Sequence, residues 1–164
     1  MRTLVLYYSN TGNTRIVAER LAGALDAELG EITCGAYLRW YGPALMFWDI
    51  FTRRRPRVTM ITPPHAHYDL TIIGGPVWSG RAAPPVLRVL ADHGDELGRV
   101  GLFVTCRGVD PNYGPEPALA DMASFLPAGV VDSRFFREAE IRSGAYGAEV
   151  DAFARALRAE APQP

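Results

Sequence analysis

Six small polar residues follow the first apolar run of the chain and lead into a helical pattern. The run Leu4–Tyr8 is followed by Ser9, Asn10, Thr11, Gly12, Asn13 and Thr14. Their hydroxyl and amide groups can donate hydrogen bonds, and a helix N-terminus adds unpaired backbone N–H groups with a partial positive charge. Gly12 lets the backbone curl without a Cβ clash. This ring of neutral donors suits a phosphate dianion, and the alternative is a helix cap that binds nothing.

Two other phosphate-binding motifs are absent from the sequence. It contains neither GxxxxGK[S/T] nor a GxGxxG that follows a strand-like run. A nucleoside-triphosphate loop and a dinucleotide fingerprint are therefore not predicted.

Two later loops carry aromatic residues. GGPVWSGRAAPPV begins at Gly74, and we expect Trp78 to lie beyond the strand end in this Gly/Pro-rich loop. A flat side chain there can stack on a flat ring, although a core tryptophan is the alternative. TCRGVDPNYG, from Thr105, offers Gly108 for a turn and Tyr113 as a second platform. Together the three loops describe a phosphorylated ligand with a large flat head group.

Alternating strands and helices are expected to position these loops. The predicted strands are Leu4–Tyr8, Glu28–Thr33, Tyr68–Gly74, Val100–Thr105 and Val130–Phe136. The predicted helices are Thr14–Leu29, Pro84–Asp92, Pro115–Phe125 and Tyr146–Leu157. This alternation predicts a doubly wound five-stranded parallel sheet with right-handed crossovers, in an α/β domain that spans residues 1–164 with a frayed tail at 160–164. Ligands of such sheets bind beyond the carboxyl ends of the strands.

Composition narrows the class of protein. Hydrophobic residues make up 48% of the 164 residues and charged residues 21%, as in a globular protein, and the net charge of −1 gives no field that would attract nucleic acid. No apolar run approaches the length of a membrane span, and no signal peptide is visible, so we expect no transmembrane segment and a cytoplasmic location. Cys34 and Cys106 are expected to be buried thiols without a disulfide framework.

One aromatic and basic segment does not fit a minimal domain. It runs from Leu38 to Arg57, and Pro43 can open a helix within it. Its apolar residues form two stripes, one of Leu45 and Trp48 and the other of Ala44, Phe47 and Phe51. Three interpretations remain open: a helix packed on the sheet, a homo-oligomer interface through Trp40–Phe51, and contact with a membrane surface.

Two of the loops resemble those of the flavodoxin family. SNTGNT resembles the family's S/T-x-T-G-x-T phosphate loop, and GGPVWSG resembles its second flavin loop, whereas CRGVD departs from the usual third loop. The resemblance implies the strand order 2-1-3-4-5 and non-covalent binding of FMN. It assigns the phosphate to residues 9–14 and one side of the flavin ring to Pro76, Val77, Trp78, Ser79 and Gly80. It assigns the pyrimidine side to Thr105, Cys106, Arg107 and Gly108, with Tyr113 as an outer stacking residue.

The resemblance leaves three functions open. An electron carrier with a redox partner protein is the first, although carriers of the family are strongly acidic and this chain is near neutral. The second is an FMN-dependent oxidoreductase that takes hydride from NAD(P)H and reduces a small acceptor such as a quinone, with Arg81 and Arg107 meeting the dinucleotide. The third is a non-redox module that binds another phosphorylated ligand or a protein.

Other candidate sites have weaker support. His65 and His67 have the spacing of a metal pair, but no Cys, Asp or Glu cluster accompanies them. His93 is expected near a helix C-terminus, where a cation is favoured. Arg107 would raise the flavin potential if it pointed inward and would have no such effect in solvent. We predict no catalytic side chain and no metal site.

Overall fold

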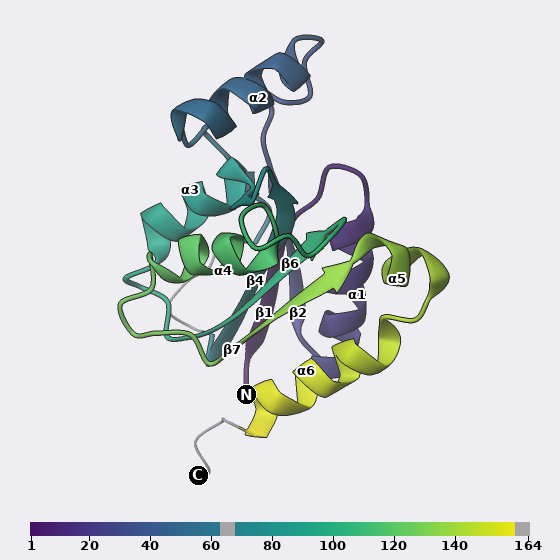
Figure 1. Ribbon diagram of the computed structural model, residues 1–164. Helices are drawn as coiled ribbons and strands as arrows, with labels where there is room; N and C mark the ends of the chain where they lie inside the picture. Colours follow the sequence, from purple (N-terminus) through teal and green to yellow (C-terminus); the bar gives the residue numbers. More distant parts are fainter. Residues whose placement is uncertain (63–67, 160–164) are drawn as a thin grey trace.

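The computed structural model describes residues 1–62 and 68–159, and Figure 1 shows how their elements are arranged. The predicted histidine pair and the predicted tail lie outside the described residues. The strands are β1 (Thr3–Tyr8), β2 (Glu28–Thr33), β3 (Thr59–Met60), β4 (Leu70–Trp78), β5 (Arg81–Ala82), β6 (Arg99–Cys106) and β7 (Asp132–Arg137). The helices are α1 (Asn13–Leu25), α2 (Gly42–Thr52), α3 (Pro84–His93), α4 (Pro115–Ala123), α5 (Glu138–Ser143) and α6 (Gly147–Ala159).

The sheet order is β3-β2-β1-β4-β6-β7, with β5 paired to β4. The five long strands β2, β1, β4, β6 and β7 pair in parallel, which confirms the predicted fold class and the order 2-1-3-4-5 for these strands. The predicted strand count was too low, because β3 and β5 add two short antiparallel pairings. Each has only two residues, too few to produce an alternating pattern in the sequence.

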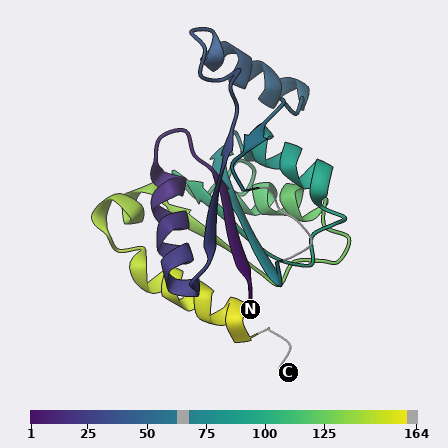
Figure 2. The same cartoon turned by 180° about the vertical axis from the view of Figure 1, so that it is seen from behind.

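Helices cover both faces of the sheet, because successive side chains of a strand point to opposite faces. Leu4 and Leu6 of β1 belong to the core under α3 and α4, whereas Val5 and Tyr7 belong to the core under α1 and α6. Figures 1 and 2 show the two helix layers from opposite sides. The apolar side chains of β1 are almost fully buried, so this strand is the centre of the fold.

Several predicted boundaries were wrong. The first helix ends at Leu25 rather than Leu29, because Asp26 takes a left-handed conformation (φ 52°) and the chain then enters β2. The third strand continues past Gly74 to Trp78, because β4 stays paired with β6 as far as Pro76 and then forms a hairpin with β5. The short helix α5 was not predicted. None of the described helices has both the length and the apolar character to cross a bilayer.

The aromatic and basic segment forms α2, which stands away from the sheet beyond α3 (Figure 1). Leu45 and Met46 pack against the core on the α3 side, and Asp49 is buried beneath the helix. Trp48 lies with Phe47 and Phe51 around an outward-facing hollow, so the predicted stripe of Leu45 with Trp48 was wrong. The helix therefore packs by one narrow face and leaves the other uncovered.

Candidate functional site

A hollow of about 400 Å³ lies at the carboxyl ends of β1, β4 and β6. The residues that line it are Thr11, Asn13, Pro76, Val77, Trp78, Ser79, Thr105, Cys106, Arg107, Glu138 and Arg142. The structure thus brings residues of all three predicted loops into one pocket. It lies where ligands bind in open α/β sheets.

The loop after β1 presents unpaired backbone donors to this pocket. The Ser9 Oγ accepts hydrogen bonds from the backbone N–H groups of Gly12 (3.2 Å) and Arg15 (3.3 Å), so Ser9 holds the start of the helix in place. Among the described residues, the N–H groups of Thr11, Asn13 and Thr14 have no such partner. Gly12 has a positive φ of 94° and open space around it. This helix start therefore suits an anion, with Ser9 shaping the loop.

One buried hydrogen bond locks the first loop to the third. The hydroxyl oxygens of Thr14 and Thr105 lie 2.8 Å apart, and both side chains are buried. One of the two hydroxyls donates to the other, so this hydrogen bond holds the start of α1 against the end of β6.

Trp78 forms a wall of the pocket from a strand rather than from a loop. It is the last residue of β4 and is half-buried, which corrects its expected position beyond the strand end. Tyr8 meets its ring edge-on at 5.7 Å between centroids, and Tyr37 packs at 6.3 Å. The Tyr37 hydroxyl donates a hydrogen bond to Asp49 Oδ2 of α2 at 2.9 Å. Tyr37 therefore connects Trp78 to that helix. Such support fixes the ring's orientation.

The second and third loops are in direct contact at Gly80. Gly80 has φ 75°, and a Cβ there would lie 2.6 Å from the Asn112 carbonyl oxygen and 2.7 Å from the Tyr113 Cα. Tyr113 itself is 69% exposed and lines a neighbouring hollow with Ser79 and Arg81. The predicted cofactor-binding residues that do not line the main pocket are Ser9, Asn10, Gly12, Thr14, Gly80, Gly108 and Tyr113.

The pocket closes against α5, which the sequence did not reveal. Glu138 Oε2 accepts a hydrogen bond from Arg107 Nε at 3.2 Å, and Arg142 also pairs with this carboxylate. The Arg107 side chain is 91% exposed, so its charge is paired and solvated rather than directed inward. Burial raises the pKa of the Cys106 thiol to about 11, so it is protonated at neutral pH. Glu138 directly follows β7, and this position at a strand's carboxyl end could have identified it.

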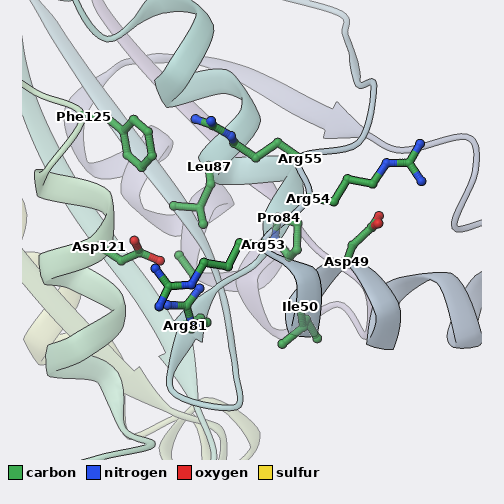
Figure 3. A pocket seen from close by; sticks show the side chains of 11 residues that line it. Asp49, Ile50, Arg53, Arg54, Arg55, Arg81, Pro84, Leu87, Asp121 and Phe125 are labelled. Carbon is green, nitrogen blue, oxygen red and sulfur yellow. The ribbon is translucent and has the colours of Figure 1, made fainter.

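A second pocket, here named the arginine pocket, has a volume of about 170 Å³ and lies between the end of α2 and the start of α3 (Figure 3). Arg53, Arg55 and Arg81 point into it, and Asp49 and Asp121 are the acidic residues that line it. The mixed charges and small volume do not suit a flavin ring. A hollow lined by Ser79, Arg81 and Asp121 adjoins both this pocket and the main one.

Solved structures that resemble this chain are flavoproteins. A flavoprotein in complex with FMN from Lactobacillus acidophilus NCFM is 25% identical, with a TM-score of 0.68 over 88% of this chain and 98% of that one. The flavodoxin, WrbA-like protein from Agrobacterium tumefaciens is 17% identical, with a TM-score of 0.60 over 96% of each chain. The two-electron reduced flavodoxin of Megasphaera elsdenii is 17% identical, with a TM-score of 0.57 over 94% of this chain and 97% of that one. No protein-family model and no curated protein matches the sequence.

The parallel sheet, its strand order and the polar helix start at its carboxyl edge define a doubly wound α/β protein with a ligand pocket at the switch point. Its structural neighbours identify the fold as flavodoxin-like, in agreement with the motifs in the first and second loops.

Proposed function

We propose that this chain binds FMN in the pocket at the carboxyl ends of β1, β4 and β6 and transfers electrons through it. The observation that carries the proposal is the meeting of two features in one pocket: the unpaired N–H groups at the start of α1 and the supported ring of Trp78. A phosphate fits the first and a flat ring fits the second. The FMN complex of the 25% identical flavoprotein supports the same ligand.

The residues of the pocket fit FMN, although the first loop, residues 9–14, has no Lys or Arg side chain to pair with the phosphate. Thr11, Asn13 and Thr14 would hold the phosphate through backbone N–H groups, and Ser9 would keep the loop in shape. Trp78 would contact the flavin ring from the β4 side. The backbone of Thr105–Arg107 would contact the same ring from the β6 side. Bound FMN supplies the redox chemistry, and the protein supplies orientation and electrostatics.

The phosphate assignment can be tested by comparing two ligands that differ only in the phosphate. Thr11→Glu places a carboxylate beside the helix start and should weaken FMN binding about 100-fold, because two negative charges then share one site. Riboflavin, which lacks the phosphate, should bind the variant and the wild type almost equally. Equal losses for both ligands would contradict the phosphate assignment, and a wild-type protein that binds neither would favour the non-redox module.

A second candidate function is an FMN-dependent NAD(P)H oxidoreductase. Arg81 lines the hollow that adjoins the flavin pocket, and Arg53 lies near it in the arginine pocket. Two guanidinium groups beside a flavin site suit the phosphates of a dinucleotide. Anaerobic addition of NADPH, and then of NADH, to the FMN-loaded protein distinguishes the two candidates. Rapid bleaching of the flavin would support the reductase, and a flavin that stays oxidised with both dinucleotides would favour a carrier that needs a partner reductase.

A further inference from the structure

The outward side of α2 and the turn before it carry five large, exposed apolar side chains. These residues, here named the aromatic face, are Leu38, Trp40, Phe47, Trp48 and Phe51, which are between 61% and 92% exposed. The three that belong to α2 lie at helical spacing around a shallow hollow of about 330 Å³. Three exposed aromatic residues gathered around one hollow mark an interaction surface rather than ordinary surface composition.

The opposite side of α2 fixes the orientation in which this face is presented. Tyr37 donates its hydroxyl hydrogen to Asp49 Oδ2 at 2.9 Å, and both residues are buried. Leu45 and Met46 pack against the core on the α3 side. The helix therefore cannot turn its aromatic side chains inward without breaking a buried hydrogen bond and removing two apolar residues from the core.

Arginines flank α2 on both sides in the sequence. The segment 38–57 contains Arg39, Arg53, Arg54, Arg55 and Arg57, and its single acidic residue is the buried Asp49. Within the described part of the chain, none of the five arginines forms a salt bridge. Arg53 and Arg55 point into the arginine pocket, whereas the Arg54 side chain extends outward from its edge (Figure 3), and Arg39 and Arg57 are exposed.

We propose that the aromatic face binds the surface of an anionic lipid bilayer. Tryptophan, phenylalanine and leucine side chains would enter the boundary between headgroups and acyl chains, and Arg39, Arg54 and Arg57 would bind lipid phosphates. At 1.5 Å per residue, α2 is about 16 Å long, which is enough to lie in this boundary but too short to cross a bilayer.

The charges favour a lipid surface over a second copy of this chain. A symmetric contact through α2 would bring two arginine-bearing segments together, with no exposed carboxylate from either segment 38–57 to neutralise them. An anionic bilayer supplies the negative charge that both segments lack. Lipid binding requires neither FMN nor electron transfer, so its test is independent of the proposed function.

Flotation of the full chain with vesicles tests this proposal. We expect the protein to float with vesicles of phosphatidylcholine mixed with phosphatidylglycerol, to remain largely unbound with phosphatidylcholine alone, and to dissociate as salt rises. Trp48→Glu/Phe51→Glu and, separately, Arg39→Glu/Arg54→Glu/Arg57→Glu should each reduce binding at least tenfold. Arg54→Glu alone should also weaken binding, whereas Arg155→Glu, which makes the same change of charge at an exposed arginine of α6, is its matched control and should bind like the wild type.

Two further measurements make the outcome decisive. Circular dichroism and a thermal melt should show that the variants fold, because every substituted side chain is exposed. Light scattering after size exclusion should give a monomer for the wild type. Absence of vesicle binding by the wild type, or loss of binding in the α6 control equal to that in the α2 variants, would overturn the proposal. A dimer that Trp48→Glu dissociates, with no binding to vesicles, would overturn it in favour of a second copy.

Discussion

The apolar side chains of the sheet and those of α2 are chemically alike but lie in opposite environments. Leu4, Val5 and Leu6 of β1 are fully buried, whereas Phe47, Trp48 and Phe51 are more than half exposed. The first group has its packing partners within the chain, on both faces of a parallel sheet. Phe47, Trp48 and Phe51 have no packing partner in the hydrophobic core that the described residues form, so the fold does not explain why these three residues are apolar. We therefore expect the sheet to determine stability and α2 to determine what the protein contacts.

The same substitution in the two regions gives the sharpest test of this comparison. Phe103→Ala removes a fully buried ring from β6 and should lower the free energy of unfolding by about 3–5 kcal/mol, because it leaves a cavity. Phe51→Ala removes a ring that is 75% exposed and should change stability by no more than about 0.5 kcal/mol. Urea unfolding measures both. A large loss for Phe51→Ala would mean that α2 is part of the cooperative core.

A second comparison concerns two glycines that share a left-handed backbone but differ in surroundings. A Cβ at Gly80 (φ 75°) would meet Asn112 and Tyr113, whereas a Cβ at Gly129 (φ 83°) would have nothing within 4 Å. Alanine costs strain at both positions, but only Gly80→Ala also pushes the second and third loops apart. We expect Gly80→Ala to lose about 1–3 kcal/mol more than Gly129→Ala, and to weaken FMN binding as well. Equal effects would mean that the contact between these loops does not shape the pocket.

Sequence reasoning succeeded where the residues themselves dictate the conformation. The strands β1, β4 and β6 were visible because strands buried on both faces read as apolar runs. The more exposed strand β2 was also predicted at its observed bounds. The polar loop after Tyr8 was visible because six small polar residues between a strand and a helix exceed the needs of a turn. Both features are local in the sequence.

Prediction from the sequence failed where the conformation depends on partners that are distant in the sequence. Trp78 belongs to β4 because Val77 and Trp78 pair with Ala82 and Arg81, and a Gly/Pro-rich stretch gives no sign of that hairpin. Arg142 reaches the pocket from the last turn of α5, a short helix that was not predicted. The pairing of Thr14 with Thr105 joins residues 91 positions apart, which no spacing rule anticipates.

That threonine pair provides a test of how firmly the first and third loops are joined. Thr14→Val leaves the Thr105 hydroxyl buried without its partner and should cost about 1–2 kcal/mol of stability. Thr14→Val/Thr105→Val removes both hydroxyls and should cost less than the sum of the two single variants, because no unpaired group remains. Strict additivity in urea unfolding would show that the two hydroxyls do not interact.

The two buried thiols allow a smaller comparison, between a pocket residue and a core residue. Burial, with Glu116 adding to it, raises the pKa of Cys106 to about 11 from its ordinary value of 9.0, and burial also raises the pKa of Cys34. A group whose pKa is raised by folding stabilises the protein below its unfolded pKa and loses that contribution as pH rises through its folded pKa. The wild type should therefore lose stability between about pH 9 and pH 11 relative to Cys106→Ala, on the order of 1 kcal/mol.

Urea unfolding of both proteins at about pH 8 and about pH 10.5 measures this difference, and Cys34 contributes equally to each protein because both retain it. The thiol should also resist alkylation at neutral pH, since the thiolate is the reactive form. A parallel loss of stability in the two proteins would mean that Cys106 titrates as it does in water. The thiol would then be in contact with solvent in the pocket, and the wall that β6 presents to the ligand would be more polar than its burial indicates.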